Sequence, residues 1–259
     1  MRPTVHRPFL LLQARDHDDP MLEHERLCFR DTMGLRDEDL FAVNATERLP
    51  TRHELATSCA VLVGGSGDYS VLDAHDWIRD LVTFTRDELV LRGKPTFASC
   101  FGFQILVLAI GGDMIRDPEK MEMGTYGVAL TPAAASDPLF AALPAAFDTQ
   151  VGHKDRASRL PDGVHVFAGS TLCPMHAFRV GALPIWATQF HPELDHRTLR
   201  ARYLRYRALY EPEAHRGDPE GAEDAFLRAL RPSEEASALL ELFARWVAHH
   251  EEELAARGL

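Results

Sequence analysis

The chain has too few basic residues to favour binding to nucleic acid. Its 259 residues include 28 Lys and Arg against 39 Asp and Glu, a formal net charge of -11. Non-specific nucleic-acid binding needs a basic face, which argues against this class of protein. No apolar run reaches 18 residues, so no membrane-spanning helix is expected. The N-terminal apolar core is too short for a signal peptide, and we expect a cytoplasmic protein without a nucleic-acid or membrane partner.

Cysteine is also scarce, and the motifs that bind common cofactors are missing. The four cysteines show no metal-ligand spacing, and in a reducing compartment they are predicted to be free thiols: Cys28, Cys59, Cys100 and Cys173. The glycine cluster at 64–68 lacks the Gly-Lys-Ser/Thr ending of a phosphate-binding loop, and no dinucleotide fingerprint is present. Scattered histidines such as His249 are expected at the surface. The sequence therefore predicts neither a metal site nor a cofactor.

The sequence is organised around residues 94–112, KPTFASCFGFQILVLAIGG. A short apolar strand runs through a tight turn into an apolar helix that ends at two glycines. The turn, Ala98 to Gly102, has the small-x-nucleophile-x-Gly pattern of a nucleophile elbow. Cys100 would then stand at a helix N-terminus, where free N–H groups and the helix dipole favour a thiolate. The alternative is an ordinary buried cysteine, so this segment alone does not establish catalysis.

Alternating strands and helices in the first half predict an α/β fold. An open, mostly parallel sheet with helices on both faces accounts for this order. Loops at the carboxyl ends of such strands form the ligand crevice, and both Cys100 and the glycine loop 64–68 fall there. Taken alone, the glycine loop would be read as a plain surface turn. The expected strands are 8–13, 40–43, 59–63 and one before Cys100, and the expected helices are 21–33, 50–58 and 76–91.

The second half supplies a histidine and an acid close together. Residues 164–168, 175–180 and a segment ending at Phe190 are expected strands, whereas 147–155 is expected to place His153 and Asp155 in a loop. Pro192 keeps His191 extended, and in an extended chain residues two apart point to the same side. Glu193 could therefore orient the imidazole, and Cys, His and an acid form a thiol nucleophile system. The alternative is a strand-ending turn with a solvated Glu193.

The last part of the chain is expected to be helical. We predict one α/β domain over 1–195, then a helical extension over 196–259 that packs on it. Its helices are expected at 197–210, 223–230 and 233–254, with a polar linker at 211–222. The last of these helices has an apolar stripe, which is expected to pack on the main domain. A partner or homodimer surface is the alternative for this stripe.

Four motifs in this order resemble the class I (triad) glutamine amidotransferase family: VLVGGSGD, ASCFGFQ, GHKD and TQFHPE. The resemblance covers about residues 9–193 and is nearest to stand-alone proteins similar to the glutaminase domain of GMP synthase. It implies a flavodoxin-like fold and an enzyme that hydrolyses the γ-amide of glutamine. Cys100 would attack the γ-carboxamide, His191 would move the proton and Glu193 would orient His191. A γ-glutamyl thioester would form and be hydrolysed by water.

The resemblance also implies a set of substrate-binding groups. The backbone N–H groups of Gly65 and Phe101 would stabilise the oxyanion. Gly67 and Gln104 would help to hold the glutamine, and the loop carrying His153 would close over it. A pair of aimed N–H donors contributes on the order of 3–4 kcal/mol of barrier reduction per donor.

The sequence departs from the family pattern at three places. Ala98 stands where glycine is common, and Phe103 stands where the family often has histidine. The third departure is that no ATP-pyrophosphatase signature follows, although free ammonia needs an acceptor. Either a separate ammonia-accepting synthase is the partner, or the substrate is another γ-glutamyl compound.

Three functions therefore remain open from the sequence. The first is glutaminase or amidotransferase activity through Cys100 on glutamine. The second is a γ-glutamyl peptidase or hydrolase for a small γ-glutamyl compound, which requires a larger leaving group to fit beside Tyr126 and residues 150–156. The third is a non-catalytic interaction protein that keeps the fold and docks through its helical tail. Turnover of a panel of γ-glutamyl substrates separates these functions.

Overall fold

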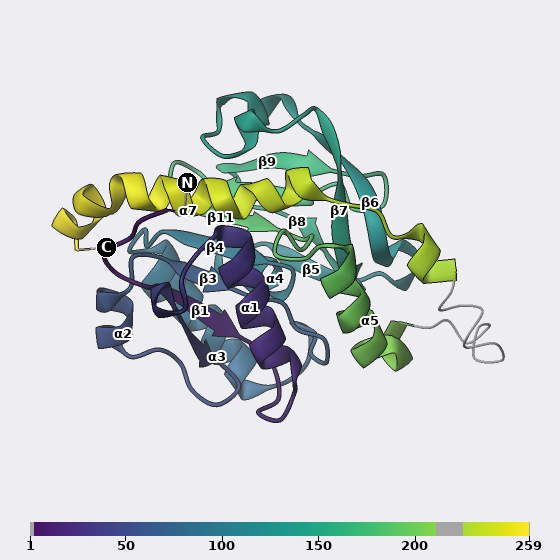
Figure 1. Ribbon diagram of the computed structural model, residues 1–259, viewed down its shortest axis with the longest axis horizontal. Helices are drawn as coiled ribbons and strands as arrows, with labels where there is room; N and C mark the ends of the chain where they lie inside the picture. The colour runs from purple at the N-terminus through teal and green to yellow at the C-terminus, as the bar shows by residue number, and fades with distance from the viewer. Residues whose placement is uncertain (1–2, 211–224, 259) are drawn as a thin grey trace.

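A nine-stranded mixed sheet forms the centre of the molecule in the computed structural model, which describes residues 3–210 and 225–258 (Figure 1). The predicted linker 211–222 lies outside the described residues. Five neighbouring strands, in the order β2-β1-β3-β4-β11, run parallel to one another. This parallel part confirms the predicted fold class. Its strands are β1 (Phe9–Gln13), β2 (Leu40–Asn44), β3 (Val61–Val63), β4 (Thr96–Ser99) and β11 (Ile185–Thr188).

Four antiparallel strands extend this sheet beyond β11, in the order β10-β9-β6-β7. They are β6 (Glu122–Leu130), β7 (Ala146–His153), β9 (Val164–Gly169) and β10 (Ala177–Val180). A separate two-stranded sheet pairs β5 (Asp113–Arg116) with β8 (Asp155–Arg159). The prediction that 147–155 forms a loop is wrong, because these residues are almost entirely strand. Buried polar residues such as Thr149 and Gln150 interrupt the apolar alternation there and so conceal the strand.

Helices cover both faces of the parallel strands because alternate strand residues point to opposite sides. Phe9 and Leu11 pack toward α1 (Met21–Met33) and α7 (Glu234–Ala256). Leu10 and Leu12 pack on the other face with α3 (Asp76–Phe84) and α4 (Phe101–Ala109). Other helices are α2 (Arg52–Thr57), α5 (His196–Tyr210), the π-helix η2 (Thr85–Val90) and the 3-10 turns η1 (Asp37–Asp39), η3 (Pro118–Lys120), η4 (Pro132–Ser136) and η5 (Phe140–Ala142). Residues 225–229, the described part of the helix predicted at 223–230, are helical as well.

The long C-terminal helix α7 crosses one face of the sheet (Figure 1). The Phe243 ring lies 5.5 Å from Phe97 and 5.8 Å from Trp186, centroid to centroid, inside the core. The Glu251 carboxylate accepts hydrogen bonds from the backbone N–H groups of His6 and Arg7 at 2.8 and 2.9 Å. The apolar stripe of α7 therefore completes the core beside α1, whereas the domain boundary at residue 195 stays a prediction. Within the described ranges, no helix is both long and apolar enough to cross a bilayer.

Candidate active site

Cys100 occupies the sharp turn between β4 and α4. Its φ of 52° makes it the one non-glycine residue with positive φ in the described part of the chain. Such a conformation costs about 1–3 kcal/mol and persists only where the surrounding structure enforces it. The Cys100 N–H donates to the Thr188 carbonyl at 2.8 Å, and the Gly102 N–H donates to the Gly64 carbonyl at 3.0 Å. Bonds to two neighbouring strand ends thus hold the thiol at the carboxyl edge of the parallel sheet.

His191 and Glu193 follow β11 and lie side by side. His191 Nδ1 is 2.7 Å from Glu193 Oε1, so Nδ1 carries the proton and Nε2 is left for the thiol. The other carboxylate oxygen, Oε2, accepts a hydrogen bond from Ser99 Oγ at 2.8 Å. Arg202 on α5 places Nη1 3.1 Å from Oε1. Three donors therefore fix a fully buried carboxylate, which in turn fixes the imidazole ring.

The charges of this group support one another. Burial alone would lower the pKa of His191, but the negative charges of Cys100 and Glu193 outweigh it and raise the pKa to about 9. Burial would raise the pKa of Glu193, but His191 and Arg202 lower it to about 2. Between these values the carboxylate and the imidazolium are both charged. An imidazolium can give its proton to a leaving group, and a thiolate is the form of cysteine that attacks carbonyl carbon.

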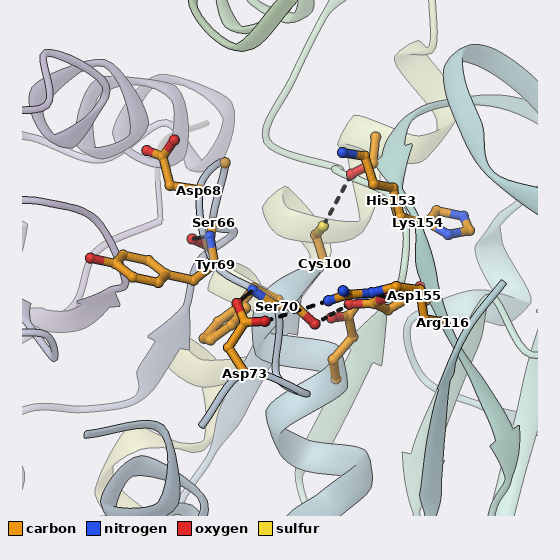
Figure 2. Close-up of a pocket in the computed structure, with 14 residues that line it drawn as sticks. Ser66, Asp68, Tyr69, Ser70, Asp73, Cys100, Arg116, His153, Lys154 and Asp155 are labelled. Carbon is orange, nitrogen blue, oxygen red and sulfur yellow. Dashed lines mark hydrogen bonds and ion pairs between the residues drawn. The ribbon is translucent and has the colours of Figure 1, made fainter. Parts of the chain in front are cut away.

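Cys100 opens into a polar pocket of about 440 Å³ (Figure 2). This volume falls in the ordinary range for small-molecule sites. The Cys100 thiol donates a weak hydrogen bond to the Gly152 carbonyl at 3.7 Å on one wall. The pocket is lined by the loop after β3, by the start of α4, by the end of β5 and by the β7–β8 junction: Ser66, Gly67, Asp68, Tyr69, Ser70, Asp73, Cys100, Phe101, Gln104, Arg116, Gly152, His153, Lys154 and Asp155.

An ion-pair network connects the loop after β3 to the opposite wall of the pocket. Arg116 Nε lies 3.2 Å from Asp155 Oδ1, and Arg116 Nη2 lies 3.5 Å from Asp73 Oδ1. Ser70 Oγ donates to the second oxygen of Asp155 (Figure 2). These contacts hold charged groups of both signs in the same pocket as Cys100.

Four of the five predicted substrate-binding residues line the pocket that contains the thiol. They are Gly67, Phe101, Gln104 and His153. The Phe101 N–H is the first of α4 and so has no carbonyl within the helix to donate to. Gln104 Nε2 donates to the Asp155 carbonyl at 3.1 Å and to Gln189 Oε1 at 3.3 Å. Gly67 leaves no room for a side chain, because an added Cβ would lie 2.1 Å from the Tyr206 ring.

Gly65 and His153 differ from what the sequence led us to expect. Gly65 is next to His191, since an added Cβ would lie 2.8 Å from His191 Cε1. Its N–H, however, donates to Glu25 Oε1 at 3.0 Å. His153 ends β7 instead of lying in a closing loop, and its Nε2 lies 2.8 Å from a buried Glu122 oxygen. Register explains this, because Glu122 is the strand partner of His153.

Sequence reasoning missed several polar residues around the site. Ser99 and Arg202 hold Glu193, and the Gln189 amide lies 3.9 Å from Cys100 Sγ. On α1, Glu25 Oε1 lies 2.9 Å from Arg15 Nη2, and Arg15 Nη1 donates to the Tyr206 hydroxyl at 2.5 Å. Ser99 and Gln189 lie within the motifs ASCFGFQ and TQFHPE, but the sequence assigned them no role, and the other residues lie outside the four motifs. Behind the pocket wall, Glu122 and His153 also meet Cys173 and His176, a group with the side chains of a metal site.

Comparison with known proteins identifies the family of this chain. The model of the family described as glutamine amidotransferase class-I matches residues 41–209. GMP synthase (glutamine-hydrolyzing) of Thermosipho melanesiensis is 36% identical over 110 residues, 42% of this chain and 20% of that protein. A protein of Methanocaldococcus jannaschii, named as one of the subunits of GMP synthase (glutamine-hydrolyzing), is 31% identical over 110 residues, 42% of this chain and 56% of that protein. The chain thus matches about a fifth of the first relative's length and just over half of the second's.

A solved structure supports the same fold. The glutamine amidotransferase of Thermotoga maritima superposes with a TM-score of 0.70 over 95% of this chain and 99% of that one, at 18% identity. At that identity the likeness concerns the fold alone. The family match covers well over half of this chain, from β2 through α5 and including the Cys100 turn and residues 191–193. The chain belongs to the class I glutamine amidotransferase family.

Proposed function

We propose that this protein hydrolyses the γ-amide of glutamine to glutamate and ammonia through a thioester on Cys100. The observation that carries the proposal is the buried His191–Glu193 pair next to a strained cysteine that opens into a polar pocket. The family match supports the same reaction class. Cys100, His191 and Glu193 are the proposed catalytic residues.

The chemistry follows from the charges at the site. The Cys100 thiolate attacks the γ-carbonyl carbon, and the His191 imidazolium gives its Nε2 proton to the departing ammonia. The neutral imidazole then takes a proton from water, which attacks the thioester and releases glutamate. Glu193 stabilises the imidazolium in both steps, and Ser99 and Arg202 position Glu193.

One of the two predicted oxyanion donors must give up its present hydrogen bond before it can stabilise the oxyanion. The Phe101 N–H stands at the N-terminus of α4, where the helix dipole also favours negative charge. The Gly65 N–H is engaged by Glu25 and must turn away from that carboxylate before it can bind the oxyanion. We propose that attack on the γ-carbonyl carbon drives this turn, because the developing oxyanion competes with Glu25 for the same donor.

A second candidate is a γ-glutamyl peptidase or hydrolase on the same residues. The observation that favours it is the extent of the pocket, which continues past Cys100 to Tyr69, Asp73 and Arg116. A leaving group larger than ammonia would have space there. Several residues are expected from the sequence to decide whether a larger leaving group fits. Among them, residues 152–155 line the pocket. Gln150 is buried instead, and its side-chain amide donates to Ser233 Oγ at 3.0 Å.

Glutamate release from the purified chain tests both candidates. Glutamine and a set of γ-glutamyl dipeptides are supplied separately, and ammonia is measured beside glutamate. We expect equal amounts of glutamate and ammonia from glutamine. Turnover of the dipeptides alone would replace the first candidate by the second. No turnover of any substrate, with an unreactive Cys100, would favour a non-catalytic interaction protein.

The pH profile of kcat/KM should show a basic limb near pH 9. His191 must keep its proton for the leaving ammonia, and its pKa of about 9 lies above the ordinary value, so activity falls as pH rises through 9. Because the pKa of His191 is raised in the folded protein, the charged imidazolium also stabilises the fold. This contribution is complete below about pH 6.5 and is lost as the pH rises through about 9.

Replacing the Glu193 carboxylate should move the basic limb of the pH profile to lower pH. In Glu193→Gln the negative charge that raises the His191 pKa is gone, and the limb should shift to lower pH by about one unit or more. Glu241→Gln is the control, because Glu241 is an exposed residue on α7 paired with Arg245. A limb at the same pH in both variants would show that Glu193 does not act on the imidazolium.

The destination of the ammonia also needs a proposal. The Methanocaldococcus relative is named as one of the subunits of a synthase, and this chain spans just over half of its length. We propose that a separate synthase accepts the ammonia in the cytoplasm. Glutamine turnover that rises when such a partner is added to the purified chain is the expected result.

A further inference from the structure

Four buried side chains converge behind the wall of the pocket. Glu122 begins β6, His153 ends β7, and Cys173 and His176 lie in the connection between β9 and β10. Each offers one ligand atom, and these atoms all lie within 4.8 Å of one another. All four residues are at most 3% exposed. None of them belongs to the group formed by Cys100, His191 and Glu193.

Hydrogen bonding within this cluster is incomplete. Glu122 Oε2 lies 2.8 Å from His153 Nε2 and 2.9 Å from His176 Nε2, so two imidazoles share one oxygen. Only the His153 contact has the alignment of a hydrogen bond. Within the described part of the chain, both ring nitrogens of His176 and Nδ1 of His153 have no hydrogen-bond partner. Buried polar atoms normally have partners, so these nitrogens point to a ligand.

We propose that Glu122, His153, Cys173 and His176 bind one Zn²⁺ ion. Two imidazole nitrogens, one thiolate sulfur and one carboxylate oxygen are donors that Zn²⁺ accepts, and four protein ligands are typical of a closed, structural site. The two negative charges of carboxylate and thiolate balance the dication. Binding releases the thiol proton, and each neutral imidazole keeps its ring proton on the nitrogen that does not bind the ion.

The four ligand atoms need to move only slightly to bind a Zn²⁺ ion. Metal–ligand bonds of about 2.0–2.3 Å place tetrahedral ligand atoms roughly 3.3–3.8 Å apart. The present separations run from 2.8 Å to 4.8 Å, so the close pairs must part and the distant ones approach by about 1 Å. Ser170 Oγ donates to Glu122 Oε1 at 3.1 Å, which orients the carboxylate from outside the site.

The position of the cluster gives the ion a structural role. It joins the end of the β6–β7 pair to the connection that follows β9. His153 and its neighbours Gly152 and Lys154 line the pocket, and the Gly152 carbonyl contacts Cys100 Sγ at 3.7 Å. Bound Zn²⁺ would therefore hold one wall of the pocket in place.

Metal binding by the full chain tests this inference independently of the proposed glutaminase. Chelator-treated protein carrying Cys100→Ala, which removes the reactive thiol, is titrated with Co²⁺ and with Zn²⁺ against a chromophoric chelator. We expect one ion per chain, a sulfur-to-cobalt charge-transfer band, and a higher Tm with Zn²⁺. Cys173→Ser should abolish the band, and His176→Gln should weaken Zn²⁺ binding by at least about 10-fold, because loss of an outer-shell partner of a metal ligand already costs that much.

The control is Cys59→Ser, which alters another buried thiol outside the cluster and should leave the band and the affinity unchanged. Far-UV circular dichroism of the chelator-treated proteins checks folding, and if Cys173→Ser does not fold, His176→Gln decides. Absence of binding in the parent chain would overturn the proposal. Binding that neither ligand variant weakens would also overturn it, because the ion would then sit elsewhere.

Discussion

Replacing Cys100 with alanine should abolish glutamate release from glutamine, with a fall in kcat/KM of about 10⁴-fold or more. The proposed thioester forms on Sγ, and no other described group can take its place at that position. The change removes a single sulfur atom from a residue that is 3% exposed, and it keeps the Cβ that the strained turn already accommodates. The fold should therefore survive, which separates loss of chemistry from loss of structure.

The matched control for Cys100→Ala is Cys59→Ala. Cys59 is also fully buried, and burial raises the pKa of its thiol to about 12, so it is inert. It precedes β3, at the end of the strand away from the glycine loop. We expect kcat/KM within about twofold of the parent chain. Iodoacetamide should label Cys100 and leave Cys59 unmodified, as mass spectrometry of peptides would show. Full activity in Cys100→Ala would refute the proposed function.

The sequence identified those site residues whose positions depend on their immediate neighbours in the chain. The strand-turn-helix around Cys100 follows from a short apolar run, a small residue on either side and a helix start. The proximity of His191 to Glu193 follows from Pro192, which extends the chain between them. Parallel strands then bring the ends of β4 and β11 together, and the register places Ser99 opposite Thr188. Each of these inferences depends on a few neighbouring residues.

The groups that sequence did not locate depend on packing between distant elements. Arg202 on α5 contacts Glu193, which lies nine residues earlier and outside that helix, and Glu25 on α1 accepts a hydrogen bond from the Gly65 N–H, 40 residues later in the chain. Neither residue carries a local pattern that marks it. The four cluster residues are likewise brought together by antiparallel pairing, which the sequence did not predict in 147–155. Long-range contacts of this kind leave no periodic signal to read.

Replacing Gly102 with alanine should destabilise the fold by about 3 kcal/mol and lower kcat/KM by about 10²-fold. Gly102 lies inside α4, where helix propensity alone would favour alanine by about 1 kcal/mol. Packing opposes this, because an added Cβ would lie 2.4 Å from the Val63 carbonyl oxygen, on the backbone of β3. Backbone cannot move as a flexible side chain can, so α4 must shift away from β3. Cys100 precedes this turn of helix and would shift with it.

The same substitution at Gly127 provides the control. Gly127 lies in β6, where the nearest atom to an added Cβ is an Asp148 side-chain oxygen at 3.7 Å, an ordinary contact. Alanine there should change the free energy of unfolding by less than about 1 kcal/mol and leave glutamate release intact. Urea denaturation and kcat/KM are measured for both variants. A Gly102→Ala variant more stable than the parent chain would mean that propensity outweighs packing and that α4 does not press on β3 at this point. A destabilised variant with full activity would show instead that the position of Cys100 is fixed by its own bond to Thr188, independently of the helix that follows.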